Sequence, residues 1–459
     1  MRLHASCPYR VNLPLRKRAV NSILGFTVGE HLAHPDAGKP VVDGAIHTMG
    51  SPRDRGLRVV HRGQQAGGTG GARNLRLHAR AVPVAAPRYW RITAPTPAHA
   101  VMNIEYDERL LWPDVLKIAA VFGVVLIHSA APLLVGYERD GAAAWWAGNL
   151  YDSLVRWCIP VFVMLSGTFL IERTSRYGTV QFLRRRFGRI LLPFLIWSVI
   201  YLLWRVHANG ENIPASAFPA QILAGPVYYH LWFIYMLFGL YLLAPILGAY
   251  TSTASRNNLV YFLVLWAIFG SVLPTIEPFV GITLFPPKGT PYAVFKYVGY
   301  FLLGHLLRDS LLSAPKRSVF AALFFVGFCL TAVGTYYLSI VRNGGSFDSL
   351  LYEYYSLNVL LMAVAVYLVG KSVEPPPVLR RLEHRTGIVR LIAACVPGIY
   401  LVHAMVIAVL RRGMVGVVLG PTSFHPLLAV PFFALVVFSV SLIVVAAVRA
   451  LPILRWSVP

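Results

Sequence analysis

The feature that most constrains this chain is a succession of apolar segments that starts near Trp112 and continues almost to the C-terminus. Each has about the 20 residues that a helix needs to cross the hydrocarbon core of a bilayer. The chain is 56% hydrophobic and only 13% charged, which is too apolar for a water-soluble enzyme of 459 residues. We predict spans at 113–136, 147–171, 188–206, 230–250, 258–276, 291–308, 317–340, 350–370, 390–410 and 426–449.

The expected fold is therefore all-α, a polytopic membrane helix bundle of about ten transmembrane helices over residues 104–459. The loops that follow the second, fourth, sixth and eighth spans carry 15 Lys and Arg residues, whereas the alternate loops carry 6. Because loops rich in Lys and Arg stay in the cytoplasm, both termini are expected to be cytoplasmic. The predicted location is the cell (inner) membrane, which the chain crosses several times.

Residues 1–103 are rich in Arg, Gly, Ala, Pro and His and contain no apolar segment long enough to span. We expect a disordered basic extension, or a segment translated upstream of the true start, for which Met102 is the candidate. The net charge of +23 is divided between this region and the loops of the bundle, so it does not indicate nucleic-acid binding. The four cysteines show no metal-binding spacing, and neither a metal nor a permanently bound cofactor is expected.

The first span carries two basic side chains on one face. Lys117 and His128 are 11 residues apart, which places them about 20° apart around a helix and about 16 Å apart along it. Asp114, three residues before Lys117, is positioned to pair with it. A cation at the cytoplasmic mouth and an imidazole deep in the membrane suit a long ligand with an anionic head, such as a coenzyme A thioester. The alternative is that Lys117 only extends to the lipid headgroups.

A basic cluster precedes the third span, in the sequence QFLRRRFGRILLP. Arginine side chains in such a position usually set the topology and contact lipid headgroups. They also bind phosphate groups through two parallel hydrogen bonds, and this cluster is predicted on the same side of the membrane as Lys117. The cluster consists of Arg184, Arg185, Arg186 and Arg189.

Several segments of the membrane region resemble, in order along the chain, the acyltransferase-3 family of integral membrane acyltransferases. The family's first span carries an Arg followed by ten residues and a His, and here Lys117 replaces that Arg. The segments YHLWF and GIYLVH are especially similar to the O-acetyltransferases of enterobacterial common antigen. The matching segments are DVLKIAAVFGVVLIH (114–128), IPVFVMLSGTFLIER (159–173), FLRRRFGRILLPFLIWS (182–198), GPVYYHLWFIYMLFGLYLLAPIL (225–247) and GIYLVHAMVI (398–407).

The resemblance implies transfer of an acetyl or longer acyl group from cytoplasmic acyl-CoA to a hydroxyl of a carbohydrate, on a lipid-linked glycan or a surface polysaccharide. His128 is expected to act as general base or as transient acyl carrier, and Glu353 or Asp152 to orient it. The residues expected to hold acetyl-CoA are Lys117, Asp114, Arg184, Arg185, Arg186 and Arg189. Those expected to line the acceptor side are Tyr229, His230, Trp232, Tyr400 and His403.

Two other classes of function fit part of these observations. A polytopic transporter or flippase of a lipid-linked sugar shares the hydropathy profile, although no internal repeat relates two halves of the chain. A non-catalytic membrane scaffold has no need for a His and a Lys on one intramembrane face. The expected partners are acyl-CoA, a carbohydrate or glycolipid acceptor, and membrane lipids.

Overall fold

The computed structural model describes residues 111–280 and 290–459. Every regular element within these residues is helical, which confirms the predicted all-α fold. The predicted extension, residues 1–103, lies outside the described residues. The α-helices are α2 (Leu111–Leu134), α3 (Tyr137–Val155), α4 (Cys158–Tyr177), α5 (Thr179–Asn209), α6 (Phe218–Ala224), α7 (Trp232–Thr253), α8 (Arg256–Ala267), α9 (Leu273–Val280), α10 (Thr290–Leu306), α11 (Ala314–Tyr336), α12 (Leu357–Ser372), α13 (Pro377–Thr386), α14 (Ile388–Arg411) and α15 (Pro426–Ala450).

Short helical turns join or extend several of these helices. A π-helical turn connects α8 to α9, and a second one prolongs α11 beyond its last residue. Turns of 3-10 helix precede α6 and α12 and follow α15. In chain order these turns are η2 (Ala215–Ala217), η3 (Ile268–Val272), η4 (Tyr337–Arg342), η5 (Leu350–Tyr352) and η6 (Leu454–Ser457).

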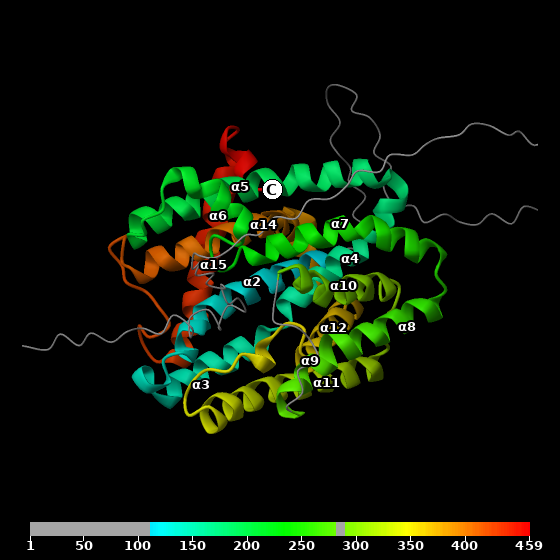
Figure 1. The fold of residues 1–459 in the computed structure, drawn as a ribbon, viewed down its shortest axis with the longest axis horizontal. Helices are drawn as coiled ribbons and strands as arrows, with labels where there is room; N and C mark the ends of the chain where they lie inside the picture. The colour runs from blue at the N-terminus through cyan, green and yellow to red at the C-terminus, as the bar shows by residue number, and fades with distance from the viewer. Residues whose placement is uncertain (1–110, 281–289) are drawn as a thin grey trace, which may run out of the picture. The chain divides into compact units, whose positions relative to one another are not determined.

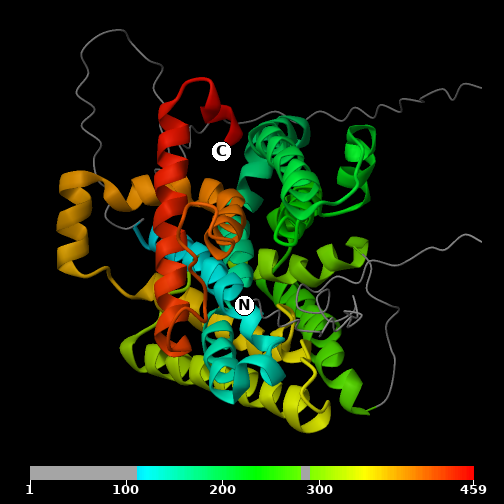
Figure 2. The same ribbon diagram turned by 90° about the vertical axis from the view of Figure 1, so that its left-hand side faces the viewer.

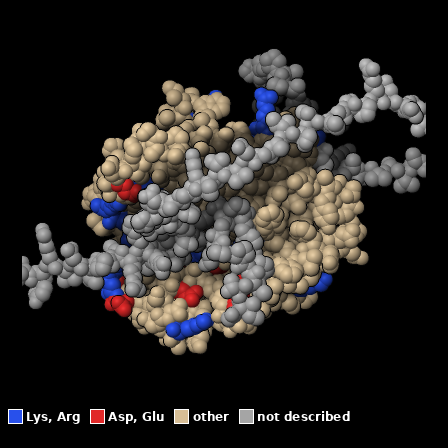
Figure 3. Space-filling view, viewed as in Figure 1, with Lys and Arg blue, Asp and Glu red and all other residues tan. Residues whose placement is uncertain are grey.

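Nine helical segments of the described chain are long and apolar enough to cross a membrane. They correspond to nine of the predicted spans, and the remaining prediction, 291–308, corresponds to α10, which is shorter at 17 residues. The surface agrees with this assignment, because uncharged side chains cover most of the described part of the face in Figure 3. The chain is therefore a multi-pass membrane protein.

The predicted span 147–171 is not one continuous helix. α3 ends at Val155 and α4 begins at Cys158, with a turn between them. This turn packs closely on α2, since a Cβ atom added to Gly123 would lie 3.0 Å from the Cβ of Cys158. An apolar sequence runs through both helices, so hydropathy alone does not reveal the turn. Its importance is that it carries Arg156 into the interior of the bundle.

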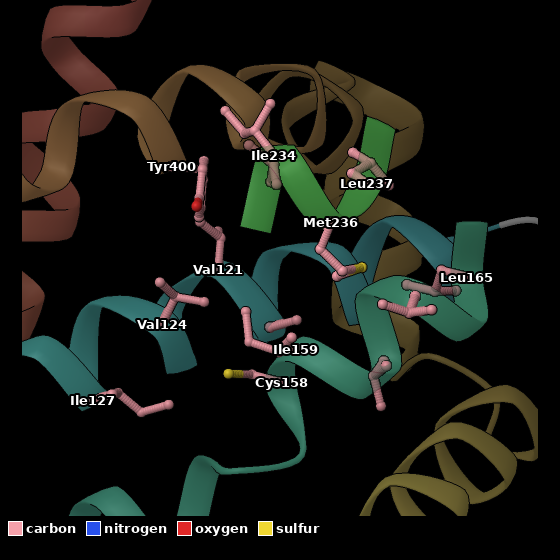
Figure 4. Packing of buried hydrophobic residues seen from close by; sticks show 14 of the residues in the cluster. Val121, Val124, Ile127, Cys158, Ile159, Leu165, Ile234, Met236, Leu237 and Tyr400 are labelled. Carbon is pink, nitrogen blue, oxygen red and sulfur yellow. The ribbon is translucent and has the colours of Figure 1, made fainter. Parts of the chain in front are cut away.

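The central element of the described bundle is α2, which contacts α3, α4, α12, α14 and α15 (Figures 1 and 2). Helices in a membrane are held together mainly by close packing of their side chains, since lipid is as apolar as the protein interior. Figure 4 shows part of this packing, to which α2, α4, α7 and α14 all contribute. The buried side chains labelled there include Val121, Val124 and Ile127 of α2, Ile159 of α4, Ile234 of α7 and Tyr400 of α14.

Helices α4 and α10 approach each other so closely that only glycine fits at two points of their interface. A Cβ atom at Gly167 would lie 1.7 Å from the carbonyl oxygen of Phe301, and one at Gly304 would lie 2.0 Å from that of Met164. The hydroxyl of Thr168 donates to the Gly304 carbonyl across the same interface, at 3.1 Å. Small residues commonly allow such backbone contact between membrane helices.

The start of α2 marks one end of the bundle. Trp112 contacts Phe169 in the second half of α4, with ring centroids 6.4 Å apart, and Tyr367 in the second half of α12, at 5.7 Å. Lys117 lies in the same first turns of α2, and Nζ of Lys371 is 5.9 Å from the Trp112 ring. We term this the basic end. Because basic residues accumulate on the cytoplasmic side, the basic end is expected to face the cytoplasm.

Candidate active site

His128 lies half-buried in the last third of α2. Its ring centroid is 4.8 Å from that of Tyr229 and 5.4 Å from that of His403, whose plane is inclined to it by 25°. His230 also contacts His403, with ring centroids 5.0 Å apart. Three imidazoles from α2, α14 and the segment before α7 therefore meet at one place, which we term the histidine cluster. The described residues contain no group of three such side chains arranged to hold a metal ion.

His403 is completely buried on α14, and its tautomer follows from its contacts. Nδ1 lies 2.7 Å from the carbonyl oxygen of Tyr400 and 3.2 Å from that of Ile399. A carbonyl oxygen only accepts hydrogen bonds, so in the neutral ring Nδ1 carries the proton and Nε2 carries the lone pair. This Nε2 atom has no hydrogen-bond partner among the described residues.

His230 comes from an irregular segment, residues 225–231, between α6 and α7. Irregular backbone is tolerated at membrane depth only where protein surrounds it, and His230 is buried. Two tyrosines hold it in place. The Tyr400 hydroxyl donates to the His230 carbonyl oxygen, and the Tyr201 ring lies 5.0 Å from the imidazole. Within the described chain neither ring nitrogen of His230 has a hydrogen-bond partner.

A polar clamp fixes the beginning of the same segment. Arg205, near the end of α5, donates to the Glu211 carboxylate at 2.6 Å and to the Val227 carbonyl oxygen at 3.3 Å. The hydrogen bonds from Arg205 hold the pKa of the Glu211 carboxyl below its usual value of 4.5. The carboxylate therefore stays charged near neutral pH and keeps Arg205 directed at the segment that carries His230.

Tyr229 and Tyr400 belong to the histidine cluster, whereas Trp232 lies in a neighbouring aromatic group. The ring of Tyr400 is 5.9 Å from that of His403. Trp232, the first residue of α7, is half-buried and stacks on Tyr354, with centroids 5.7 Å apart and planes at 25°. Of the predicted acceptor-side residues, the structure thus brings four together and places Trp232 beside them.

A buried ion pair lies where α3 meets α4. Nε of Arg156 is 2.6 Å from Oδ1 of Asp152, and the two side chains are only 6% and 0% exposed. The guanidinium donates to the Tyr352 carbonyl oxygen at 3.2 Å and lies over the rings of Tyr352, at 4.2 Å, and Tyr354, at 5.4 Å. The sequence marks Arg156 as a functional candidate, because it is an ionisable side chain inside an apolar segment, but it assigns Arg156 no specific role.

The carboxylates predicted to orient His128 have other hydrogen-bond or ion-pair partners. Glu353 accepts a hydrogen bond from the Ser349 hydroxyl at 3.4 Å. Asp152 is paired with Arg156. Among the described residues no carboxylate is hydrogen-bonded to His128. The role of Glu353 stays a prediction.

Lys117 pairs with Asp114 at the basic end, with Nζ 2.9 Å from Oδ1. The Lys117 side chain is 37% exposed, so part of it is accessible to a ligand. Because α2 is one continuous helix from Leu111 to Leu134, Lys117 and His128 share a face and lie about 16 Å apart along the axis.

The four predicted arginines lie in the first third of α5. α5 begins two residues after α4 ends, so this cluster lies at the basic end, as Lys117 does. Arg185 lies over the ring of Tyr177 at 4.4 Å, and Arg186 is half-buried. The structure therefore brings both predicted donor-binding groups to one end of the bundle. The exposed members of the cluster are Arg184, Arg185 and Arg189.

A family model described as an acyltransferase domain matches residues 110–447, which include every site residue described above. The chain belongs to the acyltransferase-3 family. It is an acyltransferase, and membership of the family favours an enzyme over a transporter or a scaffold. No characterised protein and no solved structure matches the chain. The finer similarity to the O-acetyltransferases of enterobacterial common antigen stays a prediction.

Proposed function

We propose that this acyltransferase-3 protein transfers an acetyl group, or a longer acyl group, from acyl-CoA to a hydroxyl of a carbohydrate. The observation that carries the proposal is the position of His128, half-buried in the bundle on the same helix face as Lys117 and about 16 Å from it. A CoA thioester is a long molecule with phosphates at one end and the reactive thioester at the other. Its shape matches this separation of a cation from an imidazole.

The donor binds from the basic end, on the cytoplasmic side of the cell (inner) membrane. Lys117 and the arginines of α5 neutralise the phosphates of CoA, and Asp114 holds the Lys117 ammonium in position through its ion pair. Arginine contributes planar, two-pronged contacts to phosphate, whereas Lys117 contributes a single charge. Acyl-CoA is a substrate in this proposal, and no resident cofactor takes part.

The chemistry takes place at His128. The acceptor oxygen forms a bond to the acyl carbon while its proton moves to the imidazole. The carbon–sulfur bond then breaks, and the proton passes to the CoA thiolate, which leaves the imidazole neutral again. Arg156 supplies a buried positive charge in the interior of the bundle, which favours the negative charge that develops on the carbonyl oxygen. The same position also allows His128 to take the acyl group first and pass it to the acceptor.

The acceptor reaches the histidine cluster from the end opposite the basic one. Tyr229 and Tyr400 offer aromatic rings, and His230 offers ring nitrogens that have no hydrogen-bond partner in the described structure. Trp232 extends the aromatic surface through its contact with Tyr354. Such a mixture of rings and hydrogen-bonding groups suits a sugar carried on a lipid-linked glycan or a surface polysaccharide.

Transfer is tested in membranes that contain the wild-type chain or His128→Ala. Both are incubated with radiolabelled acetyl-CoA, and the label in the glycolipid and polysaccharide fractions is counted. The variant is expected to lose transfer by about 100-fold to 10,000-fold, the usual contribution of a general base. His305→Ala is the matched control, because His305 lies in α10, outside the histidine cluster. Full transfer by His128→Ala refutes the role of His128, and no transfer by the wild type refutes the proposed function.

A further inference from the structure

We infer that His403 takes the place that a carboxylate occupies beside many catalytic histidines: its Nε2 accepts a hydrogen bond from His128 and so orients that imidazole. The inference rests on the proposed function, since it concerns how His128 is prepared for proton transfer. His403 is therefore a positioning residue, which acts on the substrate only through His128. Its complete burial agrees with such a role, because the substrate has no need to reach it.

The first support is the lone pair on His403. The carbonyl oxygens of Tyr400 and Ile399 fix the proton on Nδ1, so in the neutral ring Nε2 carries the lone pair and is an acceptor. A buried acceptor without a partner is uncommon in a native protein and calls for an explanation. A donor supplied by a neighbouring ring provides one.

The second support is the arrangement of the two rings. Their centroids are 5.4 Å apart and their planes are inclined by only 25°. Two imidazoles joined by an N–H···N bond of about 2.9 Å have centroids about 5 Å apart, which is close to the separation of these two rings. His230 approaches His403 edge-on instead, with planes at 77°.

The third support is the lack of a competitor in the described structure. The two carboxylates predicted to orient His128 have other partners, Ser349 for Glu353 and Arg156 for Asp152. An N–H of His128 directed at His403 leaves the lone pair on the other ring nitrogen of His128, where it accepts the proton of the acceptor hydroxyl. In catalytic triads the buried carboxylate has the same effect, and loss of the correct tautomer there lowers kcat by about 10,000-fold.

Two substitutions of His403 separate this role from a structural one. His403→Gln places a side-chain oxygen near the position of Nε2, so it still accepts from His128, but it lacks the donor at Nδ1. His403→Asn places its amide nitrogen near the position of Nδ1, so it keeps the bond to the Tyr400 carbonyl but lacks the acceptor at Nε2. Each variant therefore keeps one function of the ring and loses the other: His403→Gln keeps the acceptor, and His403→Asn keeps the donor.

The assay measures transfer from radiolabelled acetyl-CoA with purified protein returned to host lipid, after each variant is shown to elute as the wild type does in detergent. We expect His403→Asn to lower kcat by about 100-fold or more, with KM for acetyl-CoA changed less than about threefold. We expect His403→Gln to stay within about tenfold of the wild type. His305→Asn, outside the cluster, is the control.

The opposite order, in which His403→Asn is active and His403→Gln is not, refutes the inference and assigns His403 a structural role. Equal loss in both variants, or full activity in both, also refutes it. If His403→Asn does not fold, His403→Glu is used to test the inference, because its carboxylate is an acceptor near the Nε2 position. Retained transfer by His403→Glu supports the inference, and loss of transfer refutes it. Failure of the proposed function is seen separately, as lack of transfer by the wild type.

Discussion

The buried ion pair of Asp152 and Arg156 provides a stringent test of the interior described above. Removal of one partner leaves the other charge inside the bundle, with 6% exposure or less. Such a loss costs about 3–5 kcal/mol in proteins. We therefore expect Asp152→Asn and Arg156→Met each to lower the free energy of unfolding by about that amount.

The double variant, Asp152→Asn with Arg156→Met, is expected to be far less destabilised than the sum of the two. It removes both charges and keeps side chains of similar volume, an exchange that is often nearly neutral for a buried pair. What it does lose is the contact of the guanidinium with the rings of Tyr352 and Tyr354, worth about 2 kcal/mol when desolvated. A loss of about 2 kcal/mol for the double variant follows.

The measurement is unfolding of the purified protein by SDS titration in mixed micelles, followed by tryptophan fluorescence. Asp140→Asn is the matched control, since Arg139 and Asp140 also form an ion pair at 2.6 Å, but the Arg139 side chain is 70% exposed. We expect this control to cost about 1 kcal/mol or less. The reasoning is wrong if Asp152→Asn costs no more than Asp140→Asn, or if the double variant loses the full sum of the single ones.

Two further predictions concern the donor side and the loop after α5. Lys117→Ala is expected to raise KM for acetyl-CoA about tenfold, which corresponds to about 1.4 kcal/mol of binding free energy. Lys117→Arg is expected to keep or lower this KM, because it retains the positive charge. Steady-state transfer assays measure both values, and an unchanged KM in the alanine variant contradicts the role of Lys117. Glu211→Gln is expected to lower stability at pH 7 by less than about 1 kcal/mol, because the carboxylate is partly exposed. The pKa of Glu211 is lowered in the folded protein, so its contribution is present above pH 4.5 and is lost as the pH falls through that lowered pKa. Thermal scans of wild type and variant should converge in acid, and a difference that persists there contradicts the clamp.

Much of the fold is predictable from the sequence, because the length and apolarity of a membrane span are local properties. The pairing of Lys117 with Asp114 is also a local property that the sequence predicts, because residues three apart on a helix are neighbours whatever surrounds the helix. The common face of Lys117 and His128 likewise follows from the geometry of a single helix. The segments that resemble the acyltransferase-3 family are continuous stretches of sequence, so they are also recognisable without the structure. The match over residues 110–447 confirms the family.

Only the tertiary structure decided how the site is assembled. The turn that carries Arg156 inward interrupts a segment that hydropathy predicts as a single span, and it packs closely on α2. His128 and His403 are distant in sequence, and no periodicity indicates that their rings meet. Which side chains touch across helices depends on the packing of the whole bundle, whereas helix formation and membrane insertion depend on one segment at a time.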